Sequence, residues 1–475
     1  MRQALNHIQH VPLDVILLIL RLVPLQDALA MFMTSKFFLS VSRLRPFWVY
    51  ANIDVDVSQR TPGRQRTDYS RISLLGLQSR VLRYHNIFKA WRRAAIETTE
   101  VHTLPLSENV RQVIAVPWTK IALTVEDDGV HFRDWGLQRS HILPLRRPAN
   151  MLIVRVDVRW VDTVGCNVVI VMLSNRGRRE LLCTEIQFYR LNTDELTTSY
   201  LTAINLPYAL ASFSLADRHL AVIGHIAPRV HFIQSLRLSY EGRLPTSTTA
   251  VVIVGLQDKL SSSSFTILDD TRFLLANPTG ITVYRFSERT LTHAGVHPKR
   301  IRPCWRHRYD TTEVLARPPI GPVLVTSGNE RCVTVCGGRD IWRVFMADEN
   351  PPRFRIVKIP LMLNFPRSFT ITIGRQMGLC NQSFLPLCFL AFSLADDTSD
   401  SHPLGCLSPT AGRVLSRRIE GQGVISFALE KYDTIDPGSM SIDEGEGRVV
   451  LVVRSHARPR DRPPSPRLVI FDLVV

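Results

Sequence analysis

Residues 13–23 are predicted to form a short helix that is apolar on every side. Pro12 can occupy the first turn, where no backbone donor is lost, and Asp14 places a negative charge near the positive end of the helix. All residues of 15–23 are aliphatic except Arg21. A helix that is apolar all round has to be buried all round. This requirement constrains the chain more than any other feature of its sequence.

Two further short helices are predicted to cover one side of the first. Pro24 ends the first helix and begins a second, Asp27 lies in the first turn of that second helix, and Thr34 or Ser35 can cap a third. A module of about 40 residues is at the lower size limit for independent folding. Each aliphatic side chain left in water forgoes roughly 1.5 to 3 kcal/mol. We therefore expect the other side of the first helix to dock another protein.

Residues 11–48 resemble the F-box. The resemblance is carried by Val11-Pro12-x-Asp14, Ile16 to Leu20, Pro24-Leu25-x-Asp27-x-Leu29, Thr34-Ser35-Lys36-x-Phe38 and Phe47-Trp48. It implies binding to the small Skp-type adaptor of cullin-RING ubiquitin ligases, and through that adaptor to cullin. The residues expected to contact the adaptor are Pro12, Leu13, Ile16, Ile19, Leu20, Pro24 and Leu25.

Two other interpretations of this segment stay open. In the first, residues 1–30 are a secretory signal peptide, because residues 11–20 have the length of its apolar region and residues 28–30 resemble a cleavage site. Asp14 and Arg21 count against it, since charges are poorly tolerated within such a run. In the second interpretation, the helix is an internal core element that packs against the rest of the chain.

Residues 51–100 are expected to connect this module to the remainder of the protein. The stretch 51–68 is polar and contains turn-forming residues, which predicts an exposed loop. Apolar residues then recur at alternating spacings of three and four, which predicts a helix of about 25 residues with one apolar stripe. The stripe comprises Leu74, Leu77, Val81, Tyr84, Phe88, Trp91 and Ala95. We expect this helix to act as a strut between two units.

Residues 101–475 change to short runs rich in Val, Ile, Leu, Phe and Thr, separated by turn residues, which predicts strands. Runs begin near residues 121, 168, 219, 272 and 323, a repeat of about 50 residues, and continuing it predicts another near 377. Antiparallel units at this period are typical of a β-propeller, here of about seven blades, and a pair of β-sandwiches is the alternative. The fold class expected is therefore α+β multidomain, with an all-α module in 1–50, a connecting helix in 51–100 and an all-β domain in 101–475.

Turn-forming residues between the runs support hairpins, since Asn, Asp and Gly readily supply positive φ angles. Such turns are predicted at 126–129, 175–177, 269–270 and 443–448. Asp127 and Asp128 therefore belong to a turn rather than to a catalytic pair. The segment 455–466 is basic and rich in proline, which predicts a loop within the last hairpin.

The charge does not point to a nucleic-acid partner, although the net charge is +16. Only seven of the 58 basic residues are lysine, and the arginines are scattered and often lie beside acids. The densest basic cluster, 299–309, also contains Trp305 and Tyr309, and we interpret it as a solvated loop. No apolar run reaches the ~18 residues that span a bilayer, so no membrane partner is expected.

No catalytic, cofactor-binding or metal-binding residues are predicted. The sequence lacks GxSxG, HExxH, GxxxxGK[ST] and a GxGxxG that opens a helix. The eight cysteines are spread too widely for a disulfide framework, and Cys332 and Cys336, on one face of a predicted strand, are expected to be buried free thiols. His219, His225 and His231 share a parity, but Pro228 interrupts them, so no metal site is expected. The chain is not expected to be an enzyme and needs no cofactor.

The resemblance and the two-unit organisation imply the substrate-recognition subunit of a Skp-cullin-F-box type E3 ubiquitin ligase in the cytoplasm or nucleus. The β-rich half would bind an unknown target protein, and proximity would supply the catalytic effect. The organisation, with the weak motif of Met440 to Val453, is similar to F-box proteins of mushroom-forming fungi. Two alternatives stay open, a secreted β-propeller lectin or hydrolase that loses residues 1–30, and an F-box scaffold outside ubiquitination.

Overall fold

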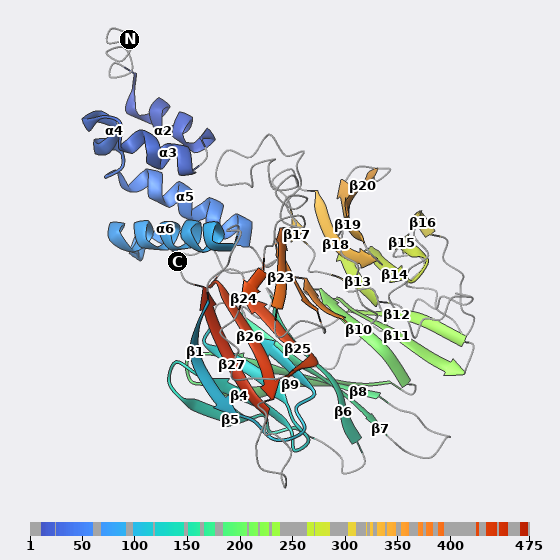
Figure 1. The fold of residues 1–475 in the computed structure, drawn as a ribbon. Helices are drawn as coiled ribbons and strands as arrows, with labels where there is room; N and C mark the ends of the chain where they lie inside the picture. Colours follow the sequence, from blue (N-terminus) through green and yellow to red (C-terminus); the bar gives the residue numbers. More distant parts are fainter. Residues whose placement is uncertain are drawn as a thin grey trace.

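The computed structural model combines a small N-terminal helical part with a larger part built from antiparallel sheets (Figure 1). The residues that it describes are 11–23, 25–59, 68–91, 98–116, 119–146, 151–161, 166–175, 184–206, 209–216, 219–227, 230–237, 264–269, 271–285, 303–309, 320, 324–325, 330–337, 340–347, 353–360, 369–373, 377–382, 388–393, 424–426, 434–443, 446–454 and 466–473. The predictions for Pro24, for the loop 455–465 and for the middle of the 175–177 turn lie outside these residues.

Five α-helices form the described N-terminal part. They are α2 (Leu13–Leu22), α3 (Leu25–Phe32), α4 (Lys36–Val41), α5 (Arg45–Gln59) and α6 (Leu74–Trp91), with a 3-10 turn at Tyr69–Arg71 before α6. The first three confirm the predicted short helices. Asp14 lies in the first turn of α2, and Ser35 caps α4 by accepting a hydrogen bond at its Oγ from the backbone N–H of Phe38, at 3.3 Å.

The expectation of an exposed loop from residue 51 is wrong for residues 51–59, because α5 continues through them. Ala51 and Val55 are buried in the same core as the residues of α2 and α6. Phe47, at the start of α5, makes edge-to-face contacts with the rings of Phe32 and Trp48, each at a centroid distance of 5.0 Å. The helical core is thus larger than three helices.

The helix α6 comprises 18 described residues and contains the predicted apolar stripe from Leu74 to Trp91, whereas Ala95 lies outside the described residues. Leu77 and Val81 are buried, and the neighbouring residues Ile87 and Ala90 are buried as well. The buried side of α6 packs against α5, and α6 also contacts β27. This helix therefore belongs to the helical core and at the same time reaches the sheets.

The β part contains seven separate sheets in the described residues, six with four strands and one with three. Three of them consist of β2–β5 (Gln112–Ala115, Ile121–Val125, Val130–Asp134, Arg139–Ile142), β6–β9 (Met151–Val161, Cys166–Asn175, Thr184–Asn192, Thr197–Leu206) and β10–β12 (Ala209–Ala216, His219–Ala227, Val230–Arg237). In each of them the strands follow one another in the sheet in chain order, and neighbouring strands are antiparallel.

The same arrangement continues in the second half of the chain. The next sheets consist of β13–β16 (Ser264–Asp269, Arg272–Asn277, Gly280–Arg285, Pro303–Arg308), β17–β20 (Leu324–Val325, Arg331–Gly337, Asp340–Ala347, Arg353–Pro360) and β21–β24 (Phe369–Ile373, Met377–Gln382, Cys388–Ser393, Val424–Ser426). Cys332 and Cys336 lie on β18 and are buried cysteines outside any disulfide, as predicted.

The last sheet joins the two ends of the β part, and we call it the closing sheet. Its order is β1 (Thr98–Pro105), β27 (Pro466–Leu473), β26 (Arg448–Arg454) and β25 (Thr434–Asp443). In the register of β1 and β27, Glu100 lies opposite Phe471 and Leu104 opposite Leu468. The first described strand after the helical part is therefore held by β27, the last described strand.

The predicted repeat corresponds to the second strand of most sheets. These strands begin at Ile121, Cys166, His219, Arg272, Arg331, Met377 and Arg448. The predicted starts at 121, 219, 272 and 377 coincide with strand starts, and 168 lies within β7. The start at 323 is out of phase, because it falls beside the two-residue first strand β17 rather than at β18.

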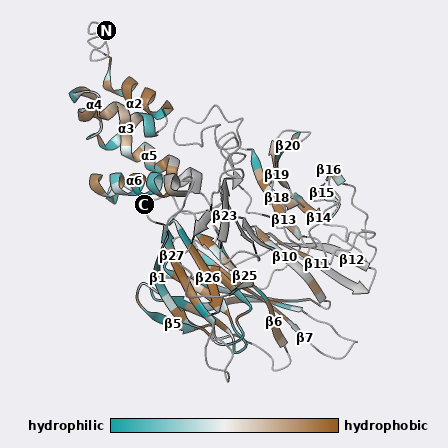
Figure 2. Cartoon of the chain, viewed as in Figure 1, coloured by the Kyte–Doolittle hydropathy of each residue, from teal (hydrophilic) through white to brown (hydrophobic). Residues whose placement is uncertain are grey.

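Neighbouring sheets pack against each other through apolar side chains. One buried cluster joins Phe132 of β4 to Val171 of β7, and another joins Phe188 of β8 to Phe213 of β10. A third joins Ala122 of β3 to the closing sheet. Figure 2 shows hydrophobic residues along β26, and on α2 in the helical part.

Candidate docking surface and its joint to the sheets

The helix α2 has one side inside the helical core and one side on the surface of the protein. Ile16 is 3% exposed and Leu20 is fully buried. On the opposite side, Leu18 is 59% and Leu22 is 69% exposed, and Ile19 lies beside them. The structure therefore leaves an aliphatic surface on a helix of only 10 residues.

The exposed aliphatic residues follow a helical spacing. Val15, Leu18, Ile19 and Leu22 stand at positions i, i+3, i+4 and i+7, which places them on one stripe. Together with Leu13 we call these residues the α2 face. The short helices α2, α3 and α4 lie at the end of the helical part that points away from the sheets, and α6 lies between them and the closing sheet (Figure 1).

Six of the seven predicted adaptor contacts are described, and they divide between the surface and the core, whereas Pro24 lies outside the described residues. Pro12, Leu13 and Ile19 are exposed. The side chains of Ile16, Leu20 and Leu25 are buried in the helical core, so these three positions have to be removed from the expected contact surface. Their side chains pack against other residues of the helical core instead.

Sequence reasoning missed Val15, Leu18 and Leu22, which belong to the exposed stripe. The spacing of three and four residues along α2 indicates that these residues share one side of the helix. The aliphatic residues of the buried side have the same spacing, so the pattern does not show which side is exposed. The interpretation of this helix as an internal core element holds for its buried side alone, and that side is covered largely by the other helices.

Polar contacts join the helices beneath this face. The indole N–H of Trp48 donates to the carbonyl oxygen of Ser42 at 2.6 Å, which fixes the turn between α4 and α5. Arg45 donates to the carbonyl oxygens of Tyr69 and Ser70, and the second of these distances is 3.1 Å. These contacts hold the short helices, α5 and the start of α6 as one unit.

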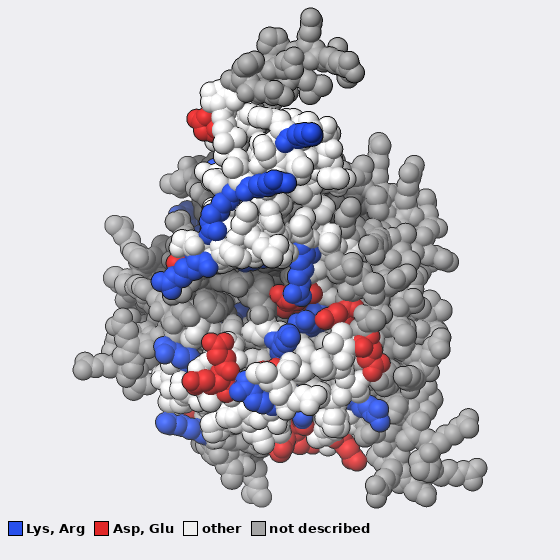
Figure 3. Space-filling view, turned by 90° about the vertical axis from the view of Figure 1, so that its left-hand side faces the viewer, with Lys and Arg blue, Asp and Glu red and all other residues white. Residues whose placement is uncertain are grey.

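The charged residues of the helical part are mostly basic on the side shown in Figure 3. Lys36 and Arg43 are exposed, and the guanidinium of Arg21 lies 5.1 Å from the centre of the Tyr50 ring. That distance permits a cation–π contact, which keeps Arg21 at the base of α2 and away from the core.

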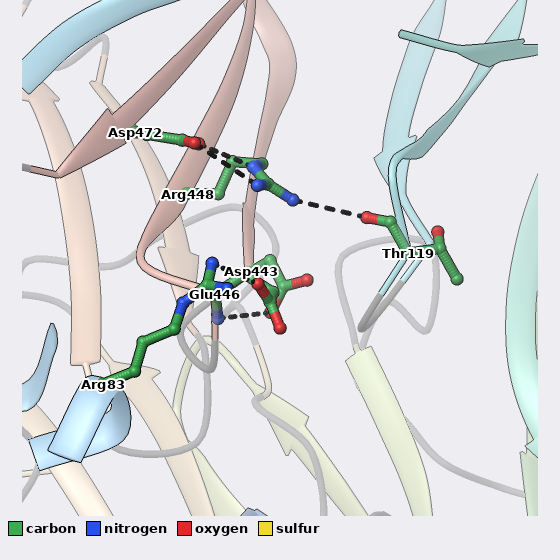
Figure 4. A network of polar contacts seen from close by, with 6 residues as sticks. All are labelled: Arg83, Thr119, Asp443, Glu446, Arg448 and Asp472. Carbon is green, nitrogen blue, oxygen red and sulfur yellow. Dashed lines mark hydrogen bonds and ion pairs between the residues drawn. The ribbon is translucent and has the colours of Figure 1, made fainter. Parts of the chain in front are cut away.

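An ion pair connects this helical unit to the closing sheet. Arg83 Nη2 of α6 lies 2.7 Å from Glu446 Oε2, which belongs to the turn between β25 and β26 (Figure 4). The Glu446 side chain is 30% exposed and that of Arg83 is 59% exposed. The pair is therefore at the surface and accessible to solvent.

The turn that carries Glu446 is itself fixed by a buried arginine (Figure 4). Arg448 Nε donates to Asp472 Oδ1 at 2.6 Å, and its Nη1 donates to the carbonyl oxygen of Thr119 at 3.4 Å. Its guanidinium also lies 5.3 Å from the centre of the Trp135 ring. Burial by itself lowers the pKa of Arg448, but the hydrogen bond and negative charge of Asp472 outweigh it and raise the pKa. Arg448 therefore joins β26, β27 and the neighbouring sheet as a permanent cation.

Another acidic residue with several polar contacts, Glu126, lies at the turn between β3 and β4. Glu126 Oε1 accepts hydrogen bonds from the Thr124 hydroxyl at 2.6 Å and from Arg133 at 2.7 Å, and its Oε2 accepts from the backbone N–H of Ser107 at 3.3 Å. Burial raises the pKa of Glu126, but these hydrogen bonds and the charge of Arg133 overcome it and lower the pKa to about 2. Glu126 is thus a buried, fully ionised carboxylate.

The ligand atoms of Glu126, Asp128 and His131 lie within 4.8 Å of one another, a spacing that a metal ion could bridge. Both oxygens of Glu126 are already engaged by protein donors, however, and His131 Nε2 is 2.9 Å from Asp128 Oδ1. The group is held by hydrogen bonds and by the ion pair of Glu126 with Arg133, and we assign no metal to it. Asp127 and Asp128 lie in the turn, as predicted.

The described part of the basic cluster is strand β16. Arg306 and Arg308 are exposed, whereas Trp305 and His307 face the next sheet. Trp305 stacks on Phe354 at 5.3 Å, and the His307 ring lies 4.6 Å from that of Trp342. Trp305 and His307 thus pack against aromatic residues of the next sheet.

Among the helices that the structure describes, none is long and apolar enough to cross a membrane.

No family model and no curated protein matches the chain. Solved structures that it resembles include a chain of the mitotic checkpoint complex, at 10% identity over 80% of this chain and 96% of that chain, with a TM-score of 0.40. A quinonprotein alcohol dehydrogenase-like protein from Bacteroides thetaiotaomicron is 10% identical over 75% of this chain and 79% of that chain, with a TM-score of 0.41. At such scores neither likeness bears on function.

Proposed function

We propose that this chain is the substrate receptor of a Skp-cullin-F-box type ubiquitin ligase, in the cytoplasm or nucleus. The observation that carries the proposal is the α2 face, whose five aliphatic side chains remain exposed in the presence of the whole chain. Burying such side chains against a partner stabilises a complex by roughly 1.5 to 3 kcal/mol for each one fully covered. A contiguous apolar surface of this kind is typical of a protein–protein interface.

In this proposal the Skp-type adaptor binds the α2 face and cullin joins through the adaptor. Pro12, Leu13 and Ile19 remain from the expected contact residues, and Val15, Leu18 and Leu22 extend the surface. The sequence resemblance to the F-box and the exposure of these side chains support it independently of each other. The chain itself performs no bond chemistry, because a receptor acts by raising the effective concentration of its target.

The β part is proposed to be a β-propeller of seven blades that captures the target protein. Seven small sheets follow one another along the chain, and the ends of the β part meet in the closing sheet. Both features are typical of propellers. Two β-sandwiches are the weaker alternative, because a sandwich consists of two larger sheets that face each other.

The signal-peptide alternative conflicts with how the helices pack. Cleavage near residue 30 would remove α2 and most of α3, including Ile16, Leu20 and Ala28. The remaining core residues Phe32 and Leu77 would then lose buried neighbours in the same cluster. A secreted lectin or hydrolase is therefore less favoured than a receptor that keeps these helices. An F-box scaffold outside ubiquitination would use the same surface and would differ in lacking cullin.

The test is recovery of the adaptor and cullin by the tagged full-length chain. The double variant Leu18→Asp/Leu22→Asp places two carboxylates on the α2 face, where desolvation in an interface is costly. We expect it to recover neither protein. The matched control is Leu75→Asp, which changes a leucine that is 72% exposed on α6. Equal recovery by the double variant and the wild type would overturn the proposal, and recovery of adaptor without cullin would favour the scaffold.

A further inference from the structure

The geometry points to a joint at which the Arg83–Glu446 ion pair fixes the orientation of the helical unit on the closing sheet. This contact sets the orientation of the α2 face relative to the β part. The inference holds whichever partners the two parts bind. We infer that Arg83 and Glu446 are positioning residues for the α2 face, and that salt weakens their effect.

The first argument is that the pair joins two separately stabilised units. On one side, Arg83 projects from α6, whose residues Leu77 and Val81 are buried in the helical core. On the other side, the β25–β26 turn belongs to a sheet with its own apolar packing. A contact between two preformed units sets their relative orientation and contributes little to the folding of either one.

The second argument is that the acceptor is held in place by its own turn. The backbone N–H of Glu446 donates to Asp443 Oδ1 at 3.3 Å, and Gly447 adopts a positive φ of 67°, a conformation that glycine favours. The next residue, Arg448, is anchored to Asp472 and to the neighbouring sheet (Figure 4). Glu446 therefore offers its carboxylate from a fixed backbone position.

The third argument concerns magnitude. Both partners of the pair are partly exposed, so the attraction is modest and is screened at physiological ionic strength over about 8 Å. The contact of α6 with β27 adds to this restraint. Reversing one charge places like charges together, because the new carboxylate of Arg83→Glu faces Glu446 and the new guanidinium of Glu446→Arg faces Arg83. The helical unit is then expected to occupy additional orientations without unfolding.

The test measures distances in the full-length protein by pulsed electron paramagnetic resonance. Nitroxide labels are attached through unnatural amino acids at Lys36 of α4 and Ser140 of β5, both of which are exposed. We expect one dominant distance for the otherwise unchanged chain. In Arg83→Glu and in Glu446→Arg, the fraction of distances outside that peak should rise about two- to fivefold, and 0.5 M salt should broaden the wild type in the same direction. The charge swap Arg83→Glu/Glu446→Arg should restore the dominant peak.

The control is Arg71→Glu, which breaks a surface ion pair with Asp68 at 3.0 Å and should leave the distances unchanged. The inference would be overturned if both single variants gave the same distances as the wild type. It would also be overturned if the charge-swap variant did not restore the dominant peak. Adaptor binding separates this result from the proposed function. Arg83→Glu should bind adaptor as the wild type does, whereas Leu18→Asp/Leu22→Asp should lose adaptor and keep the dominant distance.

Discussion

The side-chain amide of Asn52 donates one hydrogen bond to the carbonyl oxygen of Trp48 at 2.8 Å and another to that of Leu77 at 3.0 Å. Because Asn52 is fully buried, this one amide joins α5 to α6 inside an otherwise apolar core. The contact explains why a polar residue lies in the interior of the helical part. It also identifies a position where a small change should separate the two helices.

Replacing Asn52 by alanine should destabilise the packing of α6 on α5. The variant loses both hydrogen bonds and leaves a small cavity, at an expected cost of about 1 to 3 kcal/mol. Hydrogen–deuterium exchange of the α5 and α6 backbone amides measures the effect. Asn86→Ala, at an exposed position of α6, is the control and should leave exchange almost unchanged. Equal protection in the two variants would contradict the role of Asn52.

Two leucines on opposite sides of α2 should separate stability from docking. Leu20→Ala removes a fully buried side chain and should lower the free energy of unfolding of the helical part by about 2 to 5 kcal/mol. Leu22→Ala, on the exposed side, should change that free energy by less than about 0.5 kcal/mol and weaken adaptor binding. Urea denaturation and titration with purified adaptor measure the two effects. A stable Leu20→Ala variant would mean that α2 is not anchored as described.

Glu126 should make stability depend on pH in the acidic range. The pKa of this carboxyl falls from its usual 4.5 to about 2 in the folded chain, so the unfolded chain binds the proton more readily. Its contribution, roughly 3 kcal/mol, is therefore complete above pH 4.5 and is lost as the pH falls toward 2. The melting temperature of Glu126→Gln should lie below that of the wild type at pH 7, and the gap should narrow below pH 4.5.

The control for this pH dependence is Glu195→Gln, an exposed position near the β8–β9 turn. Its melting temperature should follow that of the wild type at every pH. A gap between Glu126→Gln and the wild type that stays constant down to pH 2 would show that the carboxylate charge is not the cause.

Two residues with the same backbone conformation should respond in opposite ways to glycine. Gln138 has a φ of 52° and Leu196 a φ of 53°, both in the left-handed region. Gln138 is exposed, so Gln138→Gly relieves backbone strain and should raise the free energy of unfolding by up to about 1 kcal/mol. Leu196 is 3% exposed, so Leu196→Gly should lower it by about 2 kcal/mol or more, because the lost packing exceeds the relieved strain. Thermal unfolding of both variants checks the signs.

The two turns that contain Gln138 and Leu196 also illustrate which local features could be predicted from the sequence. Asp134 Oδ1 accepts from the backbone N–H groups of Gly136 and Leu137, and Asn192 Oδ1 accepts in the same way from Asp194 and Glu195. Such caps depend on the turn's own residues, and the same holds for the Ser35 cap of α4. Local chemistry of this kind is visible in the sequence, and so are the strand runs that begin at Ile121 and Arg272.

Features that depend on distant packing could not be predicted. The polar residues after residue 50 favoured a loop over α5, whose buried Asn52 donates a hydrogen bond to the carbonyl oxygen of Leu77, a residue 25 positions away. Both sides of α2 are aliphatic, so the sequence did not show which side faces the core, and three expected contact residues lie on the wrong side. The contact between Arg83 and Glu446 could not be predicted for the same reason, because the two residues are 363 positions apart in the sequence.

The pairing of β1 with β27 has a consequence for synthesis on the ribosome. The helices emerge first and have most of their core partners within residues 11–91, so they can fold early. Strand β1 follows them, but its hydrogen-bonding partner, Pro466–Leu473, is synthesised only after the other described sheets. Until β27 is present, β1 lacks this partner, and its unpaired edge is open to premature association. A chain interrupted before β27 would therefore leave the first strand of the β part unpaired on this side.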